Sequence, residues 1–358
     1  MSIPDRAADI DAAWLGAALA ERHPGVRVGA VEIVEQTDGT NAHARLRVRY
    51  DADAGAPERL FCKLLPQAPG WREPIAASGM GPREVRFYRQ LAPELGMRVP
   101  TMHAALHREE DGAFLLLLED ILEAGCTISP GPPGVAPDAA AGALEDLAEL
   151  HQRFEDRARR AREASWVEPP LYDPSYGGRM LDHALTHHRE RLGAPFAAVA
   201  ECYLAAAPRM HALWEEGPTT VIHGDTHIGN LFDDAGRTGF LDWGILSTGP
   251  ALRDVSYFLN MALSVEDRRT HERALLRHYL AVRRAAGGTP PSEDEAWALH
   301  RLHAAYCVVA SCQIVMFPDN LSPARERFSE AFLARAQAAV DDLDAMAALR
   351  AAGIHTDG

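Results

Sequence analysis

The chain has 358 residues, of which 47% are hydrophobic, and its formal net charge at pH 7 is −15. This length suits two lobes with a sizeable buried core, and the acidic balance argues against nucleic acid or an anionic membrane surface as a partner. Charges interrupt the apolar runs of the opening segment and the longest apolar stretch, near Phe114, is short, so neither a secretory leader nor a membrane span is expected. The cysteines are odd in number and mostly unpaired in spacing, which favours reduced thiols and a cytoplasmic location.

Two alternating strands joined by a turn are predicted over residues 31–50. The turn contains Gly39, Thr40 and Asn41, whose backbone amides are candidates for covering phosphate groups, although an ordinary hairpin turn explains the same pattern. An apolar strand is predicted next, over residues 60–65, with Lys63 in its middle. Burying an ammonium group there is costly unless an anion pairs with it. Lys63 is therefore the candidate for a phosphate-binding lysine, and a surface lysine is the alternative.

A helix is predicted over residues 82–91, with Val85, Tyr88 and Leu91 along one stripe. A buried strand over residues 114–118 follows and leads into Glu119, Asp120 and Ile121. A link rich in proline and glycine occupies residues 129–134, and the chain beyond it is predicted to be mainly helical, beginning with residues 139–154. These patterns predict an N-terminal lobe over residues 1–120 and a helical C-terminal lobe over residues 121–358.

The segment 221–254 is the richest in candidate catalytic groups, because it contains His223, Asp225, His227, Asn230 and Asp242. The five-residue separation of Asp225 and Asn230 lets one tight loop aim a carboxylate at a substrate hydroxyl while an amide oxygen reaches a metal ion. Apolar residues on both sides of a turn at residues 233–236 predict a strand, a turn and a second strand. Such a hairpin is expected to return Asp242 towards Asn230, which predicts two oxygen ligands with spacing suited to Mg²⁺.

Three other interpretations of this segment stay open. Aspartate, asparagine and glycine are common in any turn, so the motif can arise by chance. A metal-dependent phosphoesterase uses clusters such as His223, Asp225 and His227, completed by Asn230 and Asp242, but it normally needs a further histidine. The third interpretation is a catalytically silent nucleotide-binding module of the same fold. In such a module we expect the base or a metal ligand to be missing.

The segment resembles the catalytic and metal-binding loops of the aminoglycoside phosphotransferase and choline kinase-like family, relatives of the protein kinases. The matching residues, in order and at family spacing, are His223-Gly224-Asp225, Asn230, Asp242-Trp243, Gly249-Pro250 and Asp254. The resemblance implies an α+β, bilobal protein-kinase-like fold, with an N-terminal antiparallel β-sheet lobe and a mainly helical C-terminal lobe. It implies an enzyme that moves the γ-phosphate of ATP, or of GTP, to a hydroxyl group with Mg²⁺.

The same resemblance implies a role for each matching residue. Asp225 is expected to accept or orient the proton of the acceptor hydroxyl, His227 to contact the transferred phosphate, and Asn230 and Asp242 to hold Mg²⁺. His223 and Asp254 are expected to brace the loop from behind. In the other lobe, Glu84 stands where the family keeps the partner of the phosphate-binding lysine, and the stretch from Glu119 to Ile121 resembles the hinge that binds adenine through main-chain groups.

The acceptor is expected to be a small hydroxyl compound, such as an aminoglycoside, an amino alcohol or a sugar, with a bulky apolar alcohol left open. Its site is sought in residues 166–188 and 295–319, which contain several aromatic residues and a cysteine: Trp166, Tyr172, Tyr176, Trp297, Tyr306, Cys312 and Phe317. Such aromatics suit stacking on a sugar or enclosing an amine, but are also common in cores. The oligomeric state is not predicted.

Overall fold

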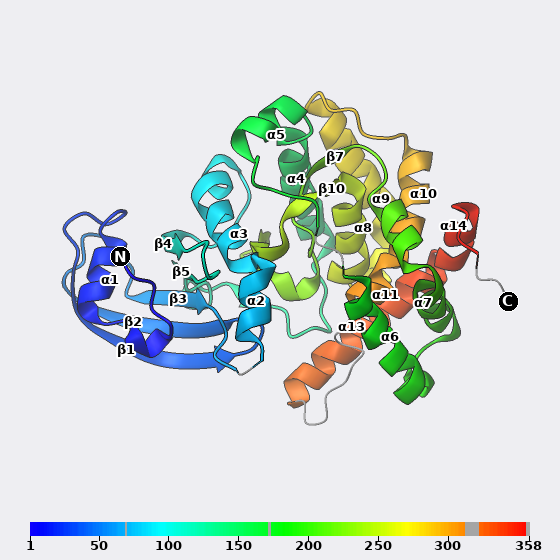
Figure 1. Ribbon diagram of the computed structural model, residues 1–358. Coiled ribbons are helices and arrows are strands. Elements are labelled where there is room, and N and C mark those ends of the chain that lie inside the picture. Colours follow the sequence, from blue (N-terminus) through cyan, green and yellow to red (C-terminus); the bar gives the residue numbers. More distant parts are fainter. Residues whose placement is uncertain (69, 171–172, 312–321, 356–358) are drawn as a thin grey trace. The chain divides into compact units, whose positions relative to one another are not determined.

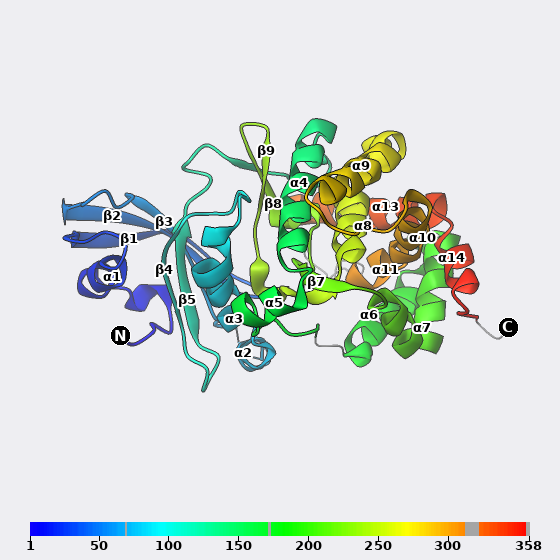
Figure 2. The same ribbon diagram turned by 90° about the horizontal axis from the view of Figure 1, so that it is seen from above.

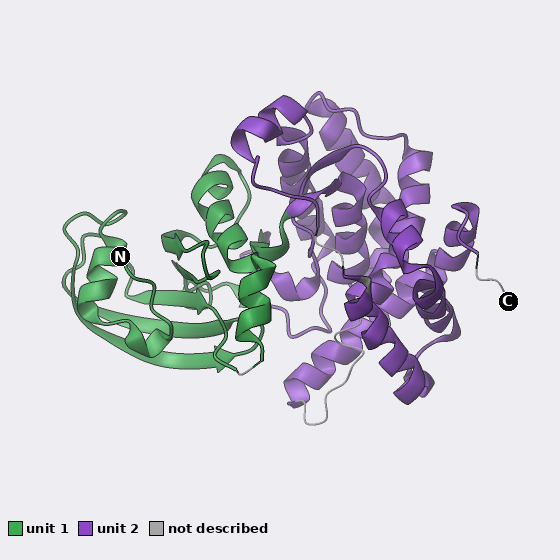
Figure 3. Cartoon of the chain, in the orientation of Figure 1, with its two compact units in different colours: residues 1–127, 239–246 green, residues 128–238, 247–358 purple. Residues whose placement is uncertain are grey.

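A computed structural model describes residues 1–68, 70–170, 173–311 and 322–355. The chain forms two compact units (Figure 3), and each is described here by itself. The first unit comprises Met1–Thr127 and Gly239–Leu246, and the second comprises Ile128–Thr238 and Ser247–Gly358. Unlike the predicted lobes, these units are not divided at one point of the chain, because Gly239–Leu246 packs with the first.

The first unit is built on a five-stranded antiparallel sheet in the order β1-β2-β3-β5-β4. The strands are β1 (Arg27–Asp38), β2 (Ala42–Ala52), β3 (Arg59–Leu64), β4 (Met102–His107) and β5 (Phe114–Glu119). The predicted hairpin and both predicted apolar strands are therefore confirmed. In the register of β2 and β3, His43 lies opposite Lys63.

One face of this sheet forms the core of the first unit. Alternate residues such as Leu46, Leu60 and Cys62 are buried together with Leu15 and Leu19 of helix α1 (Ala12–Leu19), which lies against the sheet (Figure 1). Because successive side chains of a strand point to opposite faces, Lys63 projects from the other face. A short 3₁₀ turn, η1 (Ala7–Asp9), precedes α1.

The helix predicted over residues 82–91 is present but differs in its bounds and winding. It begins as α3 (Met80–Arg86), after α2 (Arg72–Ser78), and continues as a π-helical turn, η2 (Phe87–Leu91), before the 3₁₀ turn η3 (Ala92–Glu94). The periodicity of apolar residues predicted the helix but not its change of pitch, since such turns are local departures inside otherwise regular helices.

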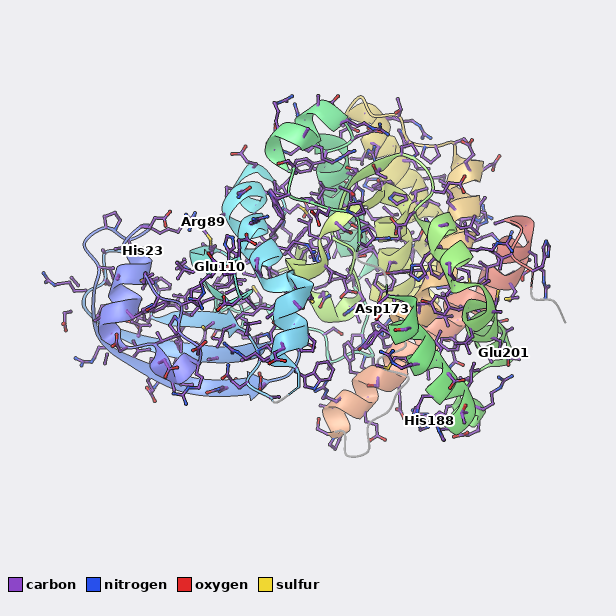
Figure 4. The ribbon with its side chains drawn as sticks, viewed as in Figure 1. His23, Arg89, Glu110, Asp173, His188 and Glu201 are labelled. Carbon is purple, nitrogen blue, oxygen red and sulfur yellow. The ribbon has the colours of Figure 1, made fainter. Side chains whose placement is uncertain are left out.

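The second unit is mainly helical, as predicted. Its helices are α4 (Pro137–Arg153), α5 (Arg157–Glu163), α6 (Pro174–His187), α7 (Ala194–Trp214), α8 (Ala251–Ala262), α9 (Val265–Ala285), α10 (Glu293–Ala304), α11 (Tyr306–Ala310), α13 (Pro323–Asp342) and α14 (Ala345–Ala351), with the 3₁₀ turn η4 (Arg189–Arg191). Figure 2 shows α4 running beside α9. Asp173 caps the start of α6, its carboxylate accepting from the Ser175 amide, and His188 follows the last residue of the helix (Figure 4).

The candidate catalytic segment contains several short strands. β7 (Thr219–Ile222) pairs antiparallel with β10 (Ser247–Pro250), and β8 (Leu231–Asp234) and β9 (Arg237–Phe240) lie beside β6 (Thr127–Ile128) in a separate small sheet. The strand, turn and strand predicted after Asn230 are therefore confirmed. The turn residues Ala235 and Gly236 both have positive φ angles, 52° and 90°, as a tight hairpin requires.

Within the described ranges, none of the helices combines the length and apolar character needed to cross a membrane. Four cysteines of that part of the chain are buried with free thiols: Cys62, Cys126, Cys202 and Cys307. Tyr172, Cys312 and Phe317, which the sequence suggested for the acceptor site, lie outside the described residues.

Candidate functional site

The first unit brings together Lys63, Glu84 and Asp242. Lys63 Nζ lies 2.7 Å from a carboxylate oxygen of Glu84 and 2.9 Å from Oδ1 of Asp242. The Lys63 and Glu84 side chains are buried, whereas that of Asp242 is 40% exposed. The sequence predicted that the Lys63 ammonium group needs an anionic partner. It has two: the buried carboxylate of Glu84 and the partly exposed carboxylate of Asp242.

Burial and charge act in opposite directions in this cluster. Burial favours the neutral amine of Lys63, but the carboxylates of Asp242 and Glu84 outweigh it and raise the pKa of Lys63 above its ordinary value. Burial raises the pKa of Glu84, against the opposing effect of the Lys63 charge. Lys63 is therefore a firmly charged cation, which suits a group that binds phosphate oxygens.

Close packing between α3 and β5 sets the position of Glu84. A Cβ atom at Gly81 would lie only 1.9 Å from the ring of Phe114, so glycine is needed where the helix meets the strand. Glu84 follows three residues later, on the same face of the helix, and this places its carboxylate at Lys63.

Asp242 is held by contacts that the sequence did not reveal. Trp243 stacks on Phe87 with ring centroids 3.8 Å apart, its backbone N–H donates to Glu84 (3.3 Å), and Arg83 donates to the carbonyl of Gly244 (2.7 Å). Asp242 itself has φ 57°, a left-handed conformation that is uncommon outside glycine and costs free energy. The strained backbone at Asp242 thus presents a partly exposed carboxylate to Lys63.

The predicted phosphate-covering turn lies between β1 and β2. Gly39 and Thr40 are exposed, and the Gly39 amide donates to the carbonyl of Asn41 (3.1 Å). Asn41 is buried, and within the described ranges its side-chain oxygen has no hydrogen-bond partner. Nearby, a hollow of about 130 Å³ is lined by residues of β1, β2 and β3: Glu35, Gln36, Thr37, His43, Ala44, Arg45 and Phe61.

The predicted hinge follows β5. The Glu119 carboxylate receives two hydrogen bonds from Arg98, at 2.8 and 3.0 Å, and one from the Thr101 amide at 2.9 Å. Ile121 is buried, and its carbonyl accepts from the Cys126 amide. The side chain of Glu119 is thus committed to structure, which leaves binding at the predicted hinge to main-chain groups.

The second unit brings together Asp225, His227 and Asn230 on the loop between β7 and β8. Asn230 Nδ2 donates to Asp225 Oδ2 (2.8 Å) and to the Asp225 carbonyl (3.0 Å), within a 3₁₀ turn, η5 (Ile228–Asn230). Both hydrogen bonds use the amide nitrogen, so the Oδ1 atom of Asn230 is left to act as an acceptor or ligand. The Asp225 side chain is 31% exposed, which leaves its carboxylate accessible.

His227 lies against this carboxylate, with Nε2 at 3.4 Å from Asp225 Oδ2. The backbone N–H of Gly229 donates to Nδ1 of His227 (3.0 Å), so in the neutral ring the proton resides on Nε2. His227 therefore directs a hydrogen-bond donor to the side of the loop where Asp225 lies.

Asp254 of α8 braces the loop from behind. Its buried carboxylate accepts from the amides of His223 (2.7 Å) and Gly224 (2.8 Å), and its carbonyl accepts from the Thr226 hydroxyl (2.9 Å). His223 is itself buried, and its Nδ1 accepts from the Asp225 amide (3.2 Å). The bracing contacts expected of His223 and Asp254 are therefore present, and Thr226 adds one that sequence reasoning missed.

A buried histidine extends this brace to α4 and α9. His151 Nε2 lies 3.3 Å from Asp254 Oδ2, while its Nδ1 lies 2.9 Å from the hydroxyl of Tyr279, to which Arg283 donates (2.8 Å). Burial lowers the pKa of His151, so the ring is neutral, donates to Asp254 and accepts from Tyr279. Burial opposes ionisation of Asp254, but the contacts with His151, His223 and the Gly224 amide hold its pKa below the ordinary value.

We expect Asp254→Asn to lower the free energy of unfolding by about 2 kcal/mol, because an amide cannot accept at both positions and a buried donor loses its partner. The pKa of Asp254 is lowered in the folded chain, so its contribution is complete above the ordinary carboxyl pKa of about 3.9 and is lost as the pH falls through the folded value. The difference between variant and parent in urea unfolding should therefore shrink in acid.

The matched control is Asp341→Asn, which alters an exposed carboxylate of α13. At neutral pH it should unfold like the parent. Equal stability of the Asp254→Asn variant and the parent at neutral pH would show that the loop does not depend on this brace.

Comparisons with known proteins identify the family and the fold of the chain. A family model described as "Phosphotransferase enzyme family" matches residues 40–295, more than half of the chain. No curated protein matches the chain in sequence.

Solved structures with similar folds span nearly all of the chain. The GDP complex of aminoglycoside 2'-phosphotransferase-IIIa is 14% identical with a TM-score of 0.52, and the match covers 92% of this chain and 99% of that one. A choline/ethanolamine kinase family protein from Mesorhizobium loti is 18% identical (TM-score 0.48; 94% and 97% covered), and macrolide 2'-phosphotransferase MphH from Brachybacterium faecium is 17% identical (TM-score 0.46; 88% and 96% covered). The first of these likenesses shows the fold, which is the α+β, protein-kinase-like one that the resemblance implied.

Proposed function

The chain belongs to the phosphotransferase enzyme family, and we propose that it transfers the γ-phosphate of ATP, or of GTP, to a hydroxyl group of a small molecule. The observation that carries this proposal is the loop of the second unit, where an accessible Asp225 carboxylate is hydrogen-bonded to Asn230 and braced from behind by Asp254. Such a rigid carboxylate is what a proton-accepting or hydroxyl-orienting group requires.

In the proposed reaction the acceptor oxygen forms a bond to the γ-phosphorus, and the bond from that phosphorus to the bridging oxygen breaks. The acceptor proton passes to Asp225, and the nucleoside diphosphate leaves. His227 Nε2–H donates to an oxygen of the transferred phosphate, and Lys63, oriented by Glu84, binds phosphate oxygens of the nucleotide. Gly39, Thr40 and Asn41 cover the phosphates with backbone amides, and main-chain groups between Glu119 and Ile121 bind the base.

We propose Asn230 and Asp242 as ligands of Mg²⁺, because this ion prefers oxygen ligands and both side chains carry them. The two hydrogen bonds from Asn230 to Asp225 use its amide nitrogen and not its oxygen. The Asp242 side chain is 40% exposed. When bound, Mg²⁺ would neutralise negative charge on the phosphates. Asp242 would then serve as a ligand of the metal, and Lys63 would keep Glu84 as its partner.

The two alternatives account for less of the structure. A phosphoesterase would use His223 as a metal ligand, yet this residue is buried and its Nδ1 accepts from the Asp225 amide. A catalytically silent module would not need to preserve Asp225, Asn230 and Asp242 together, with Lys63 paired to Glu84. A cytoplasmic location, with reduced cysteines, remains part of the proposal.

We expect Asp242→Ala to abolish the dependence of nucleotide binding on Mg²⁺, because the substitution removes the charged ligand of the proposed metal. Titration of ATP analogue binding, at several Mg²⁺ concentrations, measures this dependence. Glu110→Ala is the matched control, since it removes an exposed carboxylate of the same unit (Figure 4). An unchanged Mg²⁺ dependence in the Asp242→Ala variant would contradict the metal assignment.

The proposed function is tested by a screen of alcohols, sugars and amino sugars, with ATP or GTP and Mg²⁺ and with ADP or GDP release as readout. Release that depends on an acceptor, together with a phosphorylated product detected by mass spectrometry, is the expected result. Phosphate release from phosphate esters, without transfer to any alcohol, would instead support the phosphoesterase. Nucleotide binding without any turnover would support the silent module.

A further inference from the structure

A cavity in the second unit lies apart from the catalytic loop. Its volume is about 270 Å³, close to the lower limit of roughly 300 Å³ for pockets that bind small molecules. The start of β7, the turn from β10 into α8 and the segment between α9 and α10 line it, together with the start of α10. The described lining residues include none of those assigned above to the proton acceptor, the nucleotide or Mg²⁺.

Strand β7 separates this cavity from the catalytic loop. Thr219 and Thr220, at the start of the strand, line the cavity, whereas its last residue, Ile222, leads directly into His223. A strand rises about 3.3 Å per residue, so Thr219 and Ile222 are about 10 Å apart. The cavity is therefore distinct from the space beside Asp225.

The floor of the cavity contains two buried polar residues, Thr220 and Arg283, whose hydrogen bonds go to other parts of the protein. The Thr220 hydroxyl donates to the carbonyl of His151 (2.7 Å). Each nitrogen of the Arg283 guanidinium group has an oxygen partner, in Gln152 (3.1 Å), Tyr279 (2.8 Å) or Glu155 (3.0 Å). The donors of the floor are thus largely committed, and Arg283 also belongs to the network that braces the catalytic loop.

Three of the lining residues carry carboxylates: Glu155, Glu216 and Glu295. Glu155 is paired with Arg283, which is the one basic residue among the described residues of the lining. Glu216 and Glu295 are exposed. Within the described part of the chain, no hydrogen bond or ion pair engages the Glu216 carboxylate. Glu295 uses only Oε2, which accepts from the amide and the hydroxyl of Ser292. The lining therefore has a net negative charge and unused acceptors.

Two arginines near the cavity do not neutralise these carboxylates. Arg160 donates to the carbonyl of Thr219 (2.9 Å), and Arg284 donates to that of Pro291 (2.9 Å). Neither forms an ion pair with Glu216 or Glu295 in the described ranges.

The rest of the lining is mostly apolar. It includes four prolines and two leucines: Pro218, Pro250, Pro290, Pro291, Leu252 and Leu299. Proline has no backbone N–H, so these positions add apolar area without adding donors. A ligand that suits this cavity must therefore bring apolar carbon and its own hydrogen-bond donors.

We propose that this cavity binds a small organic ammonium compound, whose apolar part packs against the prolines and Leu299 while its ammonium group pairs with Glu216 and Glu295. An ammonium group donates three hydrogen bonds and accepts none, which matches a lining rich in acceptors. A carboxylate ligand would meet like charges, and a neutral alcohol would lack the electrostatic attraction. This inference goes beyond the proposed phosphotransfer and does not depend on it.

The test compares three compounds of similar shape: cyclohexylmethylamine, cyclohexylmethanol and cyclohexanecarboxylate. Chemical-shift mapping by NMR at pH 7, on the full chain without nucleotide, measures both affinity and position. The amine should shift the amide signals of Thr220 and Leu299 and leave those of Gly224 and Gly229 unchanged. The alcohol should bind about tenfold more weakly and the carboxylate not detectably. Added salt should weaken binding of the amine, because the carboxylates are exposed.

Substitutions that remove charge but keep size test the two carboxylates. Glu216→Gln should weaken binding of the amine about threefold, and the double variant with Glu295→Gln about tenfold, since each exposed ion pair contributes little. The matched control is Glu201→Gln, which alters an exposed carboxylate of α7 away from the lining (Figure 4) and should bind like the parent. Asp225→Ala should also bind the amine like the parent, because the catalytic loop is not part of this site.

Four results would overturn the proposal. These are no saturable shift with the amine, equal affinity for the alcohol, parent affinity in the double variant, or shifts confined to the signals of Gly224 and Gly229. Loss of amine binding in Asp225→Ala would place the compound beside the catalytic carboxylate and would also refute the separate site. None of these outcomes bears on phosphotransfer, which the screen of alcohols and sugars tests independently.

Discussion

Asp225→Ala should lower turnover at least about a hundredfold while nucleotide affinity stays close to that of the parent. The carboxylate is the only part of the loop that this change removes, because the bracing contacts of Asp254 go to the amides of His223 and Gly224. The acceptor hydroxyl would then lose the group that orients it and takes its proton. Initial-rate kinetics with saturating nucleotide, and a separate titration of nucleotide binding, measure the two effects.

Asp341→Ala is a suitable control for this variant, since it removes an exposed carboxylate of the same unit. Asn230 loses a partner when Asp225 is replaced, so thermal unfolding should be compared as well. Turnover close to that of the parent, in a folded Asp225→Ala variant, would remove Asp225 from its proposed role.

Lys63→Met should both raise the KM for ATP and lower the free energy of unfolding by about 3 kcal/mol. The substitution keeps side-chain volume but leaves Glu84 buried without the ammonium that lies 2.7 Å away. Asp242 contributes less to this loss, because its side chain is 40% exposed and water screens it. Urea unfolding measures the change in the free energy of unfolding. Initial-rate kinetics, under conditions in which the variant is folded, measure the KM for ATP.

The double variant Lys63→Met with Glu84→Gln separates these effects. It removes the unpaired buried charge, so stability should recover in part, whereas KM for ATP should stay high because the phosphate-binding cation is still missing. Recovery of a normal KM in the double variant would show that Lys63 acts only by neutralising Glu84. An unaltered KM in the single variant would mean that Lys63 does not bind the nucleotide.

The parts of the fold that could be predicted from the sequence are those with strong local patterns. The strand that carries Lys63 is apolar on both sides of a single charge, and the hairpin after Asn230 has apolar runs flanking turn residues. Both are present as β3 and as β8 with β9. The pairing of Lys63 with Glu84 was foreseen through a family resemblance, since nothing in the spacing of two residues on different elements establishes a contact.

The remaining features depend on packing between distant segments, which no local pattern encodes. Lys63 and Asp242 are 179 positions apart, and their contact requires Trp243 to stack on Phe87. His151 is one of the buried residues of α4, and it contacts Asp254 at a separation of 103 residues. Such contacts are decided by tertiary structure, so the sequence identified the loop residues but not the network that holds them.

The membership of Gly239–Leu246 in the first unit has a consequence for the order of folding during synthesis. Residues 1–127 emerge from the ribosome long before Trp243, which supplies the ring against Phe87 and a backbone donor to Glu84. Domains usually fold as they are made, from the N-terminus onward. Here the contacts of Trp243 with Phe87 and Glu84 can form only after residues 128–238, which belong to the helical unit, have been translated.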